Sequence, residues 1–163
     1  GFNWNWLWVL GSIFSVLGAI YTAFLFAQAR ARDLWQSKWV SATHMLVHAI
    51  ISGSFVLMIV SPLSKNYMAN FLLLSITINI IIIMKEILFP HNTPDSKKAI
   101  HLMTKGYYSK YFWLGITLGS FIPIIMLSTQ IGELVIIAGV LSLIGNYLTE
   151  YVRIRIPQMI PLS

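Results

Sequence analysis

The sequence lacks cysteine and is poor in charge. Because none of the 163 residues is cysteine, the chain by itself can form no disulfide, no thiolate-bound iron–sulfur cluster and no cysteine-based zinc site. Charged residues make up 10% of the chain, against roughly 25% in soluble domains. This scarcity, together with 57% apolar residues and a mean hydropathy of +0.75, predicts an all-α, multi-pass integral membrane protein.

Acidic residues are especially scarce, since 5 Asp and Glu stand against 11 Lys and Arg. The basic residues fall in the turns between apolar runs and form no continuous patch. Anionic lipid headgroups and membrane topology account for such a distribution. We therefore expect the lipid bilayer as the partner of these basic turns, and no nucleic acid.

Long apolar runs define the predicted architecture, because a transmembrane helix needs about 20 consecutive apolar residues. The chain offers a single bundle of five spans, at residues 4–29, 39–63, 66–84, 111–129 and 134–152. The last two come from one apolar stretch too long for a single crossing, so we predict a hairpin turning at 130–133, with a kink at Pro123. Gly115 and Gly119 predict a helix-packing face. A basic helix over 94–105 is expected to lie in the membrane interface.

The positive charges give an orientation. Five spans place three segments on the same side of the membrane: the corner at 30–38, the loop at 85–110 and the tail at 153–163. These segments hold 10 of the 11 Lys and Arg, and only Lys65 lies on the opposite side. Cytoplasmic loops are enriched in Lys and Arg. We therefore expect the N-terminus outside and the C-terminus in the cytoplasm.

Ionisable side chains inside the spans are the candidate functional residues. His44 and His48 lie one turn apart in the second span, Tyr21 lies deep in the first, and Glu86 and Glu150 lie near the cytoplasmic ends of theirs. Such residues usually face the bundle interior and mark proton or substrate paths. His48 and Tyr21 are candidates for a quinone site or a proton path. His44, Glu86 and Glu150 are candidates for a proton path.

Structural alternatives stay open for these residues. Each imidazole can simply hydrogen-bond a neighbouring helix, and both carboxylates can pair locally with Lys85 and Arg153. Two histidines one turn apart could bind a metal only with help from another helix. The sequence has no nucleophile–base pair, phosphate-binding glycine loop or strong metal-ligand spacing, so we expect no catalytic residue and no metal site. Because His91 and His101 lie in the polar loop, we expect no haem within the chain.

Several motifs resemble those of a known family. They are 21–25 (YTAFL) with 32–37 (RDLWQS), Gly106-Tyr107-Tyr108 with Phe112-Trp113, Gly119 and Pro123, and the ending with Arg153, Gln158 and 161–163 (PLS). Together they make the chain similar to the C-terminal helical bundle of the NrfD/PsrC family, the membrane subunits of polysulfide-reductase-like respiratory complexes. Family members often have prolines where this chain has Lys38-Trp39, and they are considerably longer. We therefore expect this chain to be the C-terminal half of a longer subunit.

The resemblance implies a haem-free subunit that exchanges electrons between menaquinone or ubiquinone and an iron–sulfur protein subunit. That protein connects to a molybdopterin catalytic subunit or to a multihaem cytochrome c, in a prokaryotic cytoplasmic (inner) membrane. The resemblance also implies that the quinone pocket lies mainly in the N-terminal bundle of such subunits.

We therefore expect the chain to be a membrane anchor and quinone-interacting subunit, or part of one. It would be a non-catalytic component of an oxidoreductase complex. The complex would be of the polysulfide reductase/molybdopterin oxidoreductase or alternative complex III type. A small proton-coupled transporter and a purely structural membrane anchor are the alternatives.

Overall fold

The computed structural model describes residues 5–26, 38–61, 65–88 and 94–160. All regular structure in these ranges is helical. Part of the predicted basic corner, including Arg30 and Arg32, lies outside the described residues. So do the motifs at 32–37 and 161–163.

Seven α-helices and two short helical turns follow one another along the described chain. They are α1 (Asn5–Phe26), α2 (Lys38–Val60), α3 (Lys65–Leu88), α4 (Pro94–Thr104), α5 (Ser109–Ile116), the π-helical turn η3 (Thr117–Phe121), α6 (Ile122–Ser128), α7 (Gly132–Arg155) and the 3₁₀ turn η4 (Pro157–Met159).

Four segments are long and apolar enough to cross a membrane. They are Val40–Val60, Lys65–Leu88, Ser109–Ser128 and Gly132–Met159. Within the described part of α1 the apolar helix Val9–Tyr21 is shorter than these. The all-α membrane fold is therefore confirmed, whereas a fifth crossing by α1 and the orientation of the termini stay predictions.

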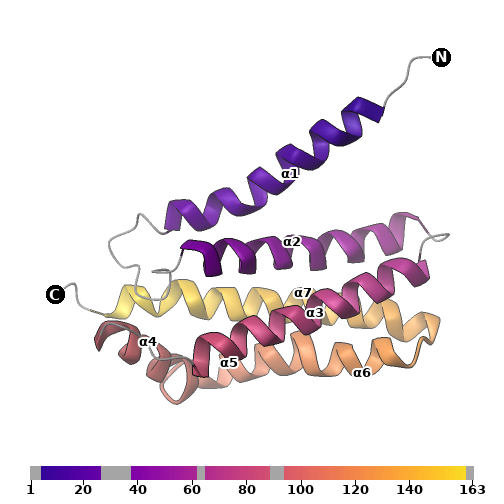
Figure 1. The fold of residues 1–163 in the computed structure, drawn as a ribbon. Helices are drawn as coiled ribbons and strands as arrows, with labels where there is room; N and C mark the ends of the chain where they lie inside the picture. The colour runs from indigo at the N-terminus through magenta and orange to yellow at the C-terminus, as the bar shows by residue number, and fades with distance from the viewer. Residues whose placement is uncertain (1–4, 27–37, 62–64, 89–93, 161–163) are drawn as a thin grey trace.

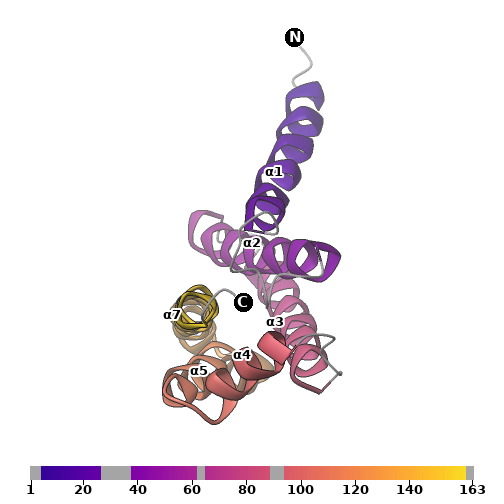
Figure 2. The same ribbon diagram turned by 90° about the vertical axis from the view of Figure 1, so that its left-hand side faces the viewer.

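Four spans form the body of the molecule and α1 lies at its edge. The helices α2, α3, α7 and the α5–α6 segment lie alongside one another (Figure 1). Seen along the bundle, α2 separates α1 from the remaining helices (Figure 2), and α1 packs against α2. Apolar side chains along α1, including Phe14 and Val9, are exposed. Such a surface suits contact with lipid.

Positive charge gathers at one end of the bundle. At this end α2 begins, α3 and α7 end, and α4 lies nearby (Figure 1). Of the nine lysines and arginines in the described ranges, only Lys65 lies at the other end. We call the lysine-rich side the basic end. The cytoplasmic location of this end stays a prediction.

The two halves of the hairpin, the α5–α6 segment and α7, pack closely where each has glycine residues. The turn between α6 and α7 contains Gln130, which has a left-handed φ of 55°. Further along, a Cβ built at Gly119 would lie 2.7 Å from the Cα of Gly145, so neither position has room for a side chain. Gly115 also faces α7, with 3.2 Å between its built Cβ and the Gly145 carbonyl oxygen. The packing face predicted at Gly115 and Gly119 is thus confirmed, with Gly145 as its counterpart.

Pro123 is accommodated by a local change of helix type. It lies in the first turn of α6, directly after the π-helical turn η3. A proline has no N–H to donate and its ring clashes with the carbonyl four residues earlier. The wider π turn places this irregularity within an otherwise continuous span.

The amphipathic helix α4 buries one of its faces. Ser96, Ala99 and Met103 are buried, whereas Tyr107, beyond the end of the helix, is 74% exposed. The helix ends at Thr104, before Tyr107, so the helical spacing no longer applies there. The Trp113 indole N–H donates a 3.0 Å hydrogen bond to the Thr104 carbonyl and ties this end of α4 to α5.

Candidate functional site

Two histidines of α2 and one carboxylate of α7 meet inside the bundle. His44 Nε2 lies 3.0 Å from Glu150 Oε1, and His48 Nδ1 lies 3.4 Å from the same oxygen. The two imidazole centroids are 4.2 Å apart, as expected for residues on successive turns. His44 is fully buried, and the side chains of His48 and Glu150 are 11% and 19% exposed. We call these three residues the His–His–Glu cluster.

A buried ion pair adjoins this cluster. Arg153 of α7 donates from Nη2 to Oε2 of Glu86 on α3. Arg153 lies close enough to His44 and His48 to act on both electrostatically. Helices α2, α3 and α7 therefore each contribute ionisable groups to one site.

Arg153 lies just beyond the predicted end of the last span at 152, yet it is buried within helix α7. Helix α7 continues to Arg155, and Arg153 is only 4% exposed. A guanidinium can be buried when a carboxylate compensates its charge and accepts its hydrogen bonds. Glu86 does so from a different helix, which the local sequence around Arg153 does not reveal.

Polar atoms without a hydrogen-bond partner surround the cluster. Among the buried side chains these include His44 Nδ1, His48 Nε2, Asn79 Oδ1 and Asn146 Nδ2. Asn79 of α3 lies next to His48, and Asn146 precedes Glu150 by about one turn of α7. Because buried polar groups are normally hydrogen-bonded, ordered water is the expected partner for these atoms.

Asn79 is a site residue that sequence reasoning missed. It lies in the isoleucine-rich run of α3, where the surrounding hydropathy hides a single amide. A usable signal was present, because Asn79 precedes Glu86 by seven residues. That spacing is about two helical turns and places both side chains on the same face of α3.

The cluster lies near the basic end of the bundle. His44 and His48 are about 9 Å and 15 Å along α2 from its first residue. Glu86 and Glu150 are close to the last residues of α3 and α7, which finish at the same end (Figure 1). The side chains thus connect the margin of the membrane-spanning region with its interior.

The two candidate quinone residues, Tyr21 and His48, lie in different surroundings. Tyr21 is 65% exposed on α1, whereas His48 is held against Glu150 within the bundle. A quinone ring needs an enclosed slot with polar groups converging on its oxygens. The exposed Tyr21 and the largely buried His48 are therefore separate candidates for contact with quinone.

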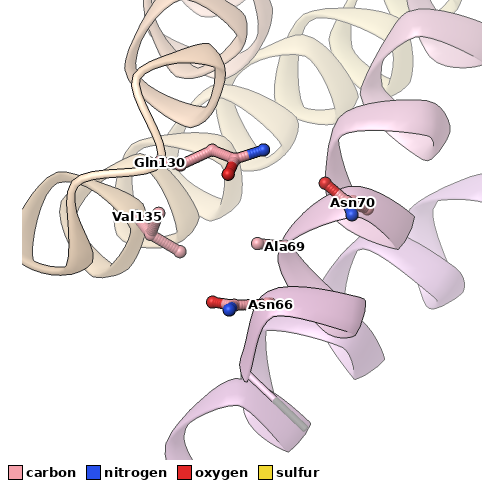
Figure 3. A pocket seen from close by; sticks show the side chains of 5 residues that line it. All are labelled: Asn66, Ala69, Asn70, Gln130 and Val135. Carbon is pink, nitrogen blue, oxygen red and sulfur yellow. The ribbon is translucent and has the colours of Figure 1, made fainter.

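Other cavities lie away from the cluster. The pocket in Figure 3 is formed by Asn66, Ala69 and Asn70 of α3 with Gln130 and Val135, near the end of the bundle opposite the basic end. Its volume of about 40 Å³ accommodates a few water molecules and no larger ligand.

A shallow groove of about 290 Å³ lies on the outer surface near the start of α5. It is lined by tyrosines and Leu148: Tyr107, Tyr108, Tyr111, Tyr147 and Tyr151. Tyr107 and Tyr147 are 74% and 70% exposed. Amphipathic rings of this kind are typical of the headgroup level of a membrane.

The His–His–Glu cluster is the part of the described structure with the clearest chemical capacity. Separations of 3.0 and 3.4 Å between a carboxylate oxygen and two imidazole nitrogens are within or close to the reach needed for proton transfer. An imidazole can accept a proton at one ring nitrogen and release it from the other. Two imidazoles and a carboxylate are also typical ligands of transition metals.

Comparison with known proteins gives one positive result for this fold and site. Curated proteins and solved structures yield no match. The family model described as "Polysulphide reductase, NrfD" matches residues 3–161, which include every residue of the site. The chain therefore belongs to the NrfD family of polysulphide reductase membrane proteins.

Proposed function

We propose that this chain is a membrane anchor and quinone-interacting subunit, or part of one, in a respiratory electron-transfer complex. NrfD proteins are membrane subunits of polysulfide-reductase-like complexes, and the four apolar spans support that role here. The complex would be of the polysulfide reductase/molybdopterin oxidoreductase or alternative complex III type, in a prokaryotic cytoplasmic membrane. Because the chain has no cysteine, an iron–sulfur protein subunit would supply the electron-transfer centre next to it.

Within this complex, we propose that the His–His–Glu cluster carries protons. A bound quinone, menaquinone or ubiquinone, supplies chemistry in which electron transfer is accompanied by proton uptake or release. The observation that supports the proposal is the contact of Glu150 with both His44 and His48 at a buried position. Ionisable groups at membrane depth are costly and are kept where they serve a path.

The proposed path begins at the basic end. The Glu86–Arg153 ion pair lies beside the cluster, in which Glu150 and the imidazoles exchange the proton. Asn79 and Asn146 orient the water that the unpartnered polar atoms require. His48 is the innermost member along α2. Tyr21, exposed on α1, stays a separate candidate for contact with quinone in the assembled complex.

The test uses the assembled complex, reconstituted in liposomes with a quinone analogue. We expect Glu150→Gln and His44→Gln to slow quinone-coupled proton uptake or release by about 100-fold or more, the usual cost of losing a positioned proton carrier. His101→Ala is the matched control, since it removes an exposed imidazole on α4. It should leave proton movement unchanged.

Subunit composition and electron transfer from an artificial donor are measured on the same samples. If both cluster variants assemble normally and retain full proton movement per electron, the proton path is refuted. The structural-anchor alternative would then be favoured, because it predicts unchanged turnover per assembled complex and affects, if anything, only the yield of complex.

A further inference from the structure

The His–His–Glu cluster has the composition and spacing of a metal site. His44, His48 and Glu150 each offer one ligand atom, and these atoms all lie within 4.8 Å of one another. They come from two helices, α2 and α7, whose packing fixes their relative position. We propose that the three side chains bind a divalent first-row transition metal ion, with Zn²⁺ as the reference case.

Two of the three separations between ligand atoms match tetrahedral coordination. Zn²⁺ binds imidazole nitrogen and carboxylate oxygen at about 2.0–2.1 Å, so two ligand atoms of one tetrahedral ion lie about 3.3 Å apart. The observed separations from Glu150 Oε1 are 3.0 Å to His44 and 3.4 Å to His48. Both separations fit an ion held between Glu150 and the imidazoles. The third separation, between the two imidazole nitrogens, is within 4.8 Å and shortens when an ion binds.

The ligand types select the metal class. Two imidazoles and one carboxylate suit Zn²⁺ and its first-row neighbours, whereas Mg²⁺ and Ca²⁺ prefer sites made of oxygen. Three protein ligands leave the fourth position for a water molecule. Asn79, beside His48 and with a buried Oδ1 that lacks a partner, supplies an acceptor for that water.

The surrounding charges permit a cation. The guanidinium of Arg153, which acts on both histidines, is paired with the carboxylate of Glu86. The carboxylate of Glu150 stands next to the ion position and offsets part of its charge. A buried cation that is compensated and coordinated in this way is tolerated in an interior of low polarity.

The metal site is independent of the proposed proton path, because it follows from ligand geometry alone. One consequence does depend on the proposed function. An ion bound to His44, His48 and Glu150 occupies the lone pairs that a proton would use, so Zn²⁺ should inhibit proton movement in the reconstituted complex. Failure of this inhibition, with Zn²⁺ bound, would refute the shared use of the residues and leave the metal site intact.

The primary experiment measures Zn²⁺ itself. The complex is purified, stripped with a chelator, exposed to Zn²⁺ and passed through a desalting column before elemental analysis. It is compared with a complex that carries His44→Gln and Glu150→Gln together. We expect the wild type to retain one more Zn²⁺ per copy of this chain than the double variant. We expect the single variants to bind at least about 100-fold more weakly, since even changes behind the ligands cost 10–100-fold.

Two further measurements keep the test decisive if a variant assembles poorly. The His101→Ala complex should retain the same Zn²⁺ as the wild type, because that imidazole lies on α4, outside the cluster. X-ray absorption of the Zn²⁺ bound to the wild type should show imidazole and carboxylate ligands. No uptake by the wild type, uptake unchanged in the double variant, or a spectrum without imidazole scattering would each overturn the proposal.

Discussion

The ion pair between Arg153 and Glu86 allows a quantitative test of the site. The two side chains are 5% and 11% exposed and belong to different helices. Replacing Arg153 with Met leaves the Glu86 carboxylate buried without its partner. Breaking one side of a buried pair costs about 3–5 kcal/mol. Arg153→Met should therefore destabilise the packing of α3 against α7 by that amount.

Hydrogen exchange on the intact complex measures this loss locally. Amides at the ends of α3 and α7 that exchange through opening of this packing should exchange about 10²- to 4 × 10³-fold faster, because each 1.4 kcal/mol is about a factor of ten. Lys98→Met is the matched control. Its partner Asp95 is 3.5 Å away, and the Lys98 side chain is 66% exposed, so the change should cost at most about 1 kcal/mol.

A double variant separates charge from packing. When Glu86→Gln is added to Arg153→Met, no uncompensated charge remains, and exchange should return to within about 1 kcal/mol of the wild type. If the double variant exchanges as fast as Arg153→Met alone, the loss comes from packing and the reasoning about buried charge is refuted.

Three further predictions concern the helices that support the site. Gly145→Ala should destabilise the hairpin by about 1–3 kcal/mol in thermal denaturation, because the new Cβ would meet the Gly119 backbone. Gly53→Ala is the control and should leave the stability unchanged, because the space around Gly53 is open. Equal effects of the two substitutions would contradict the close packing. Trp113→Phe removes the hydrogen bond to the Thr104 carbonyl and should weaken α4 by about 0.5–1.5 kcal/mol, seen as faster exchange of α4 amides alone. Replacing exposed Lys97 and Lys98 with Gln should weaken binding of anionic lipid by about 1 kcal/mol per lysine at low salt; unchanged binding in a vesicle or nanodisc assay would show that α4 does not face the headgroups.

The amino-acid sequence by itself determined the class of this protein. The length of an apolar run and the need of a backbone in lipid to satisfy its own hydrogen bonds are local properties. All five predicted spans therefore appear as helices near their expected residues, and four of the described segments are long and apolar enough to cross a membrane. The hairpin turn near Gln130 and the packing face at Gly115 and Gly119 could also be predicted from local sequence. A few residues are enough to end a helix, and glycines on one face are enough to let a neighbouring helix approach closely.

Only the tertiary structure decided which polar groups meet. Glu150 contacts His44 from 106 residues away, and Arg153 pairs with Glu86 across 67 residues. Hydropathy gives the length of each helix but not its rotation about its own axis, because lipid and protein interior accept the same apolar side chains. The rotation of α2, α3 and α7 is set by packing among them, and that rotation brings separate histidine, glutamate and arginine residues together into one buried site.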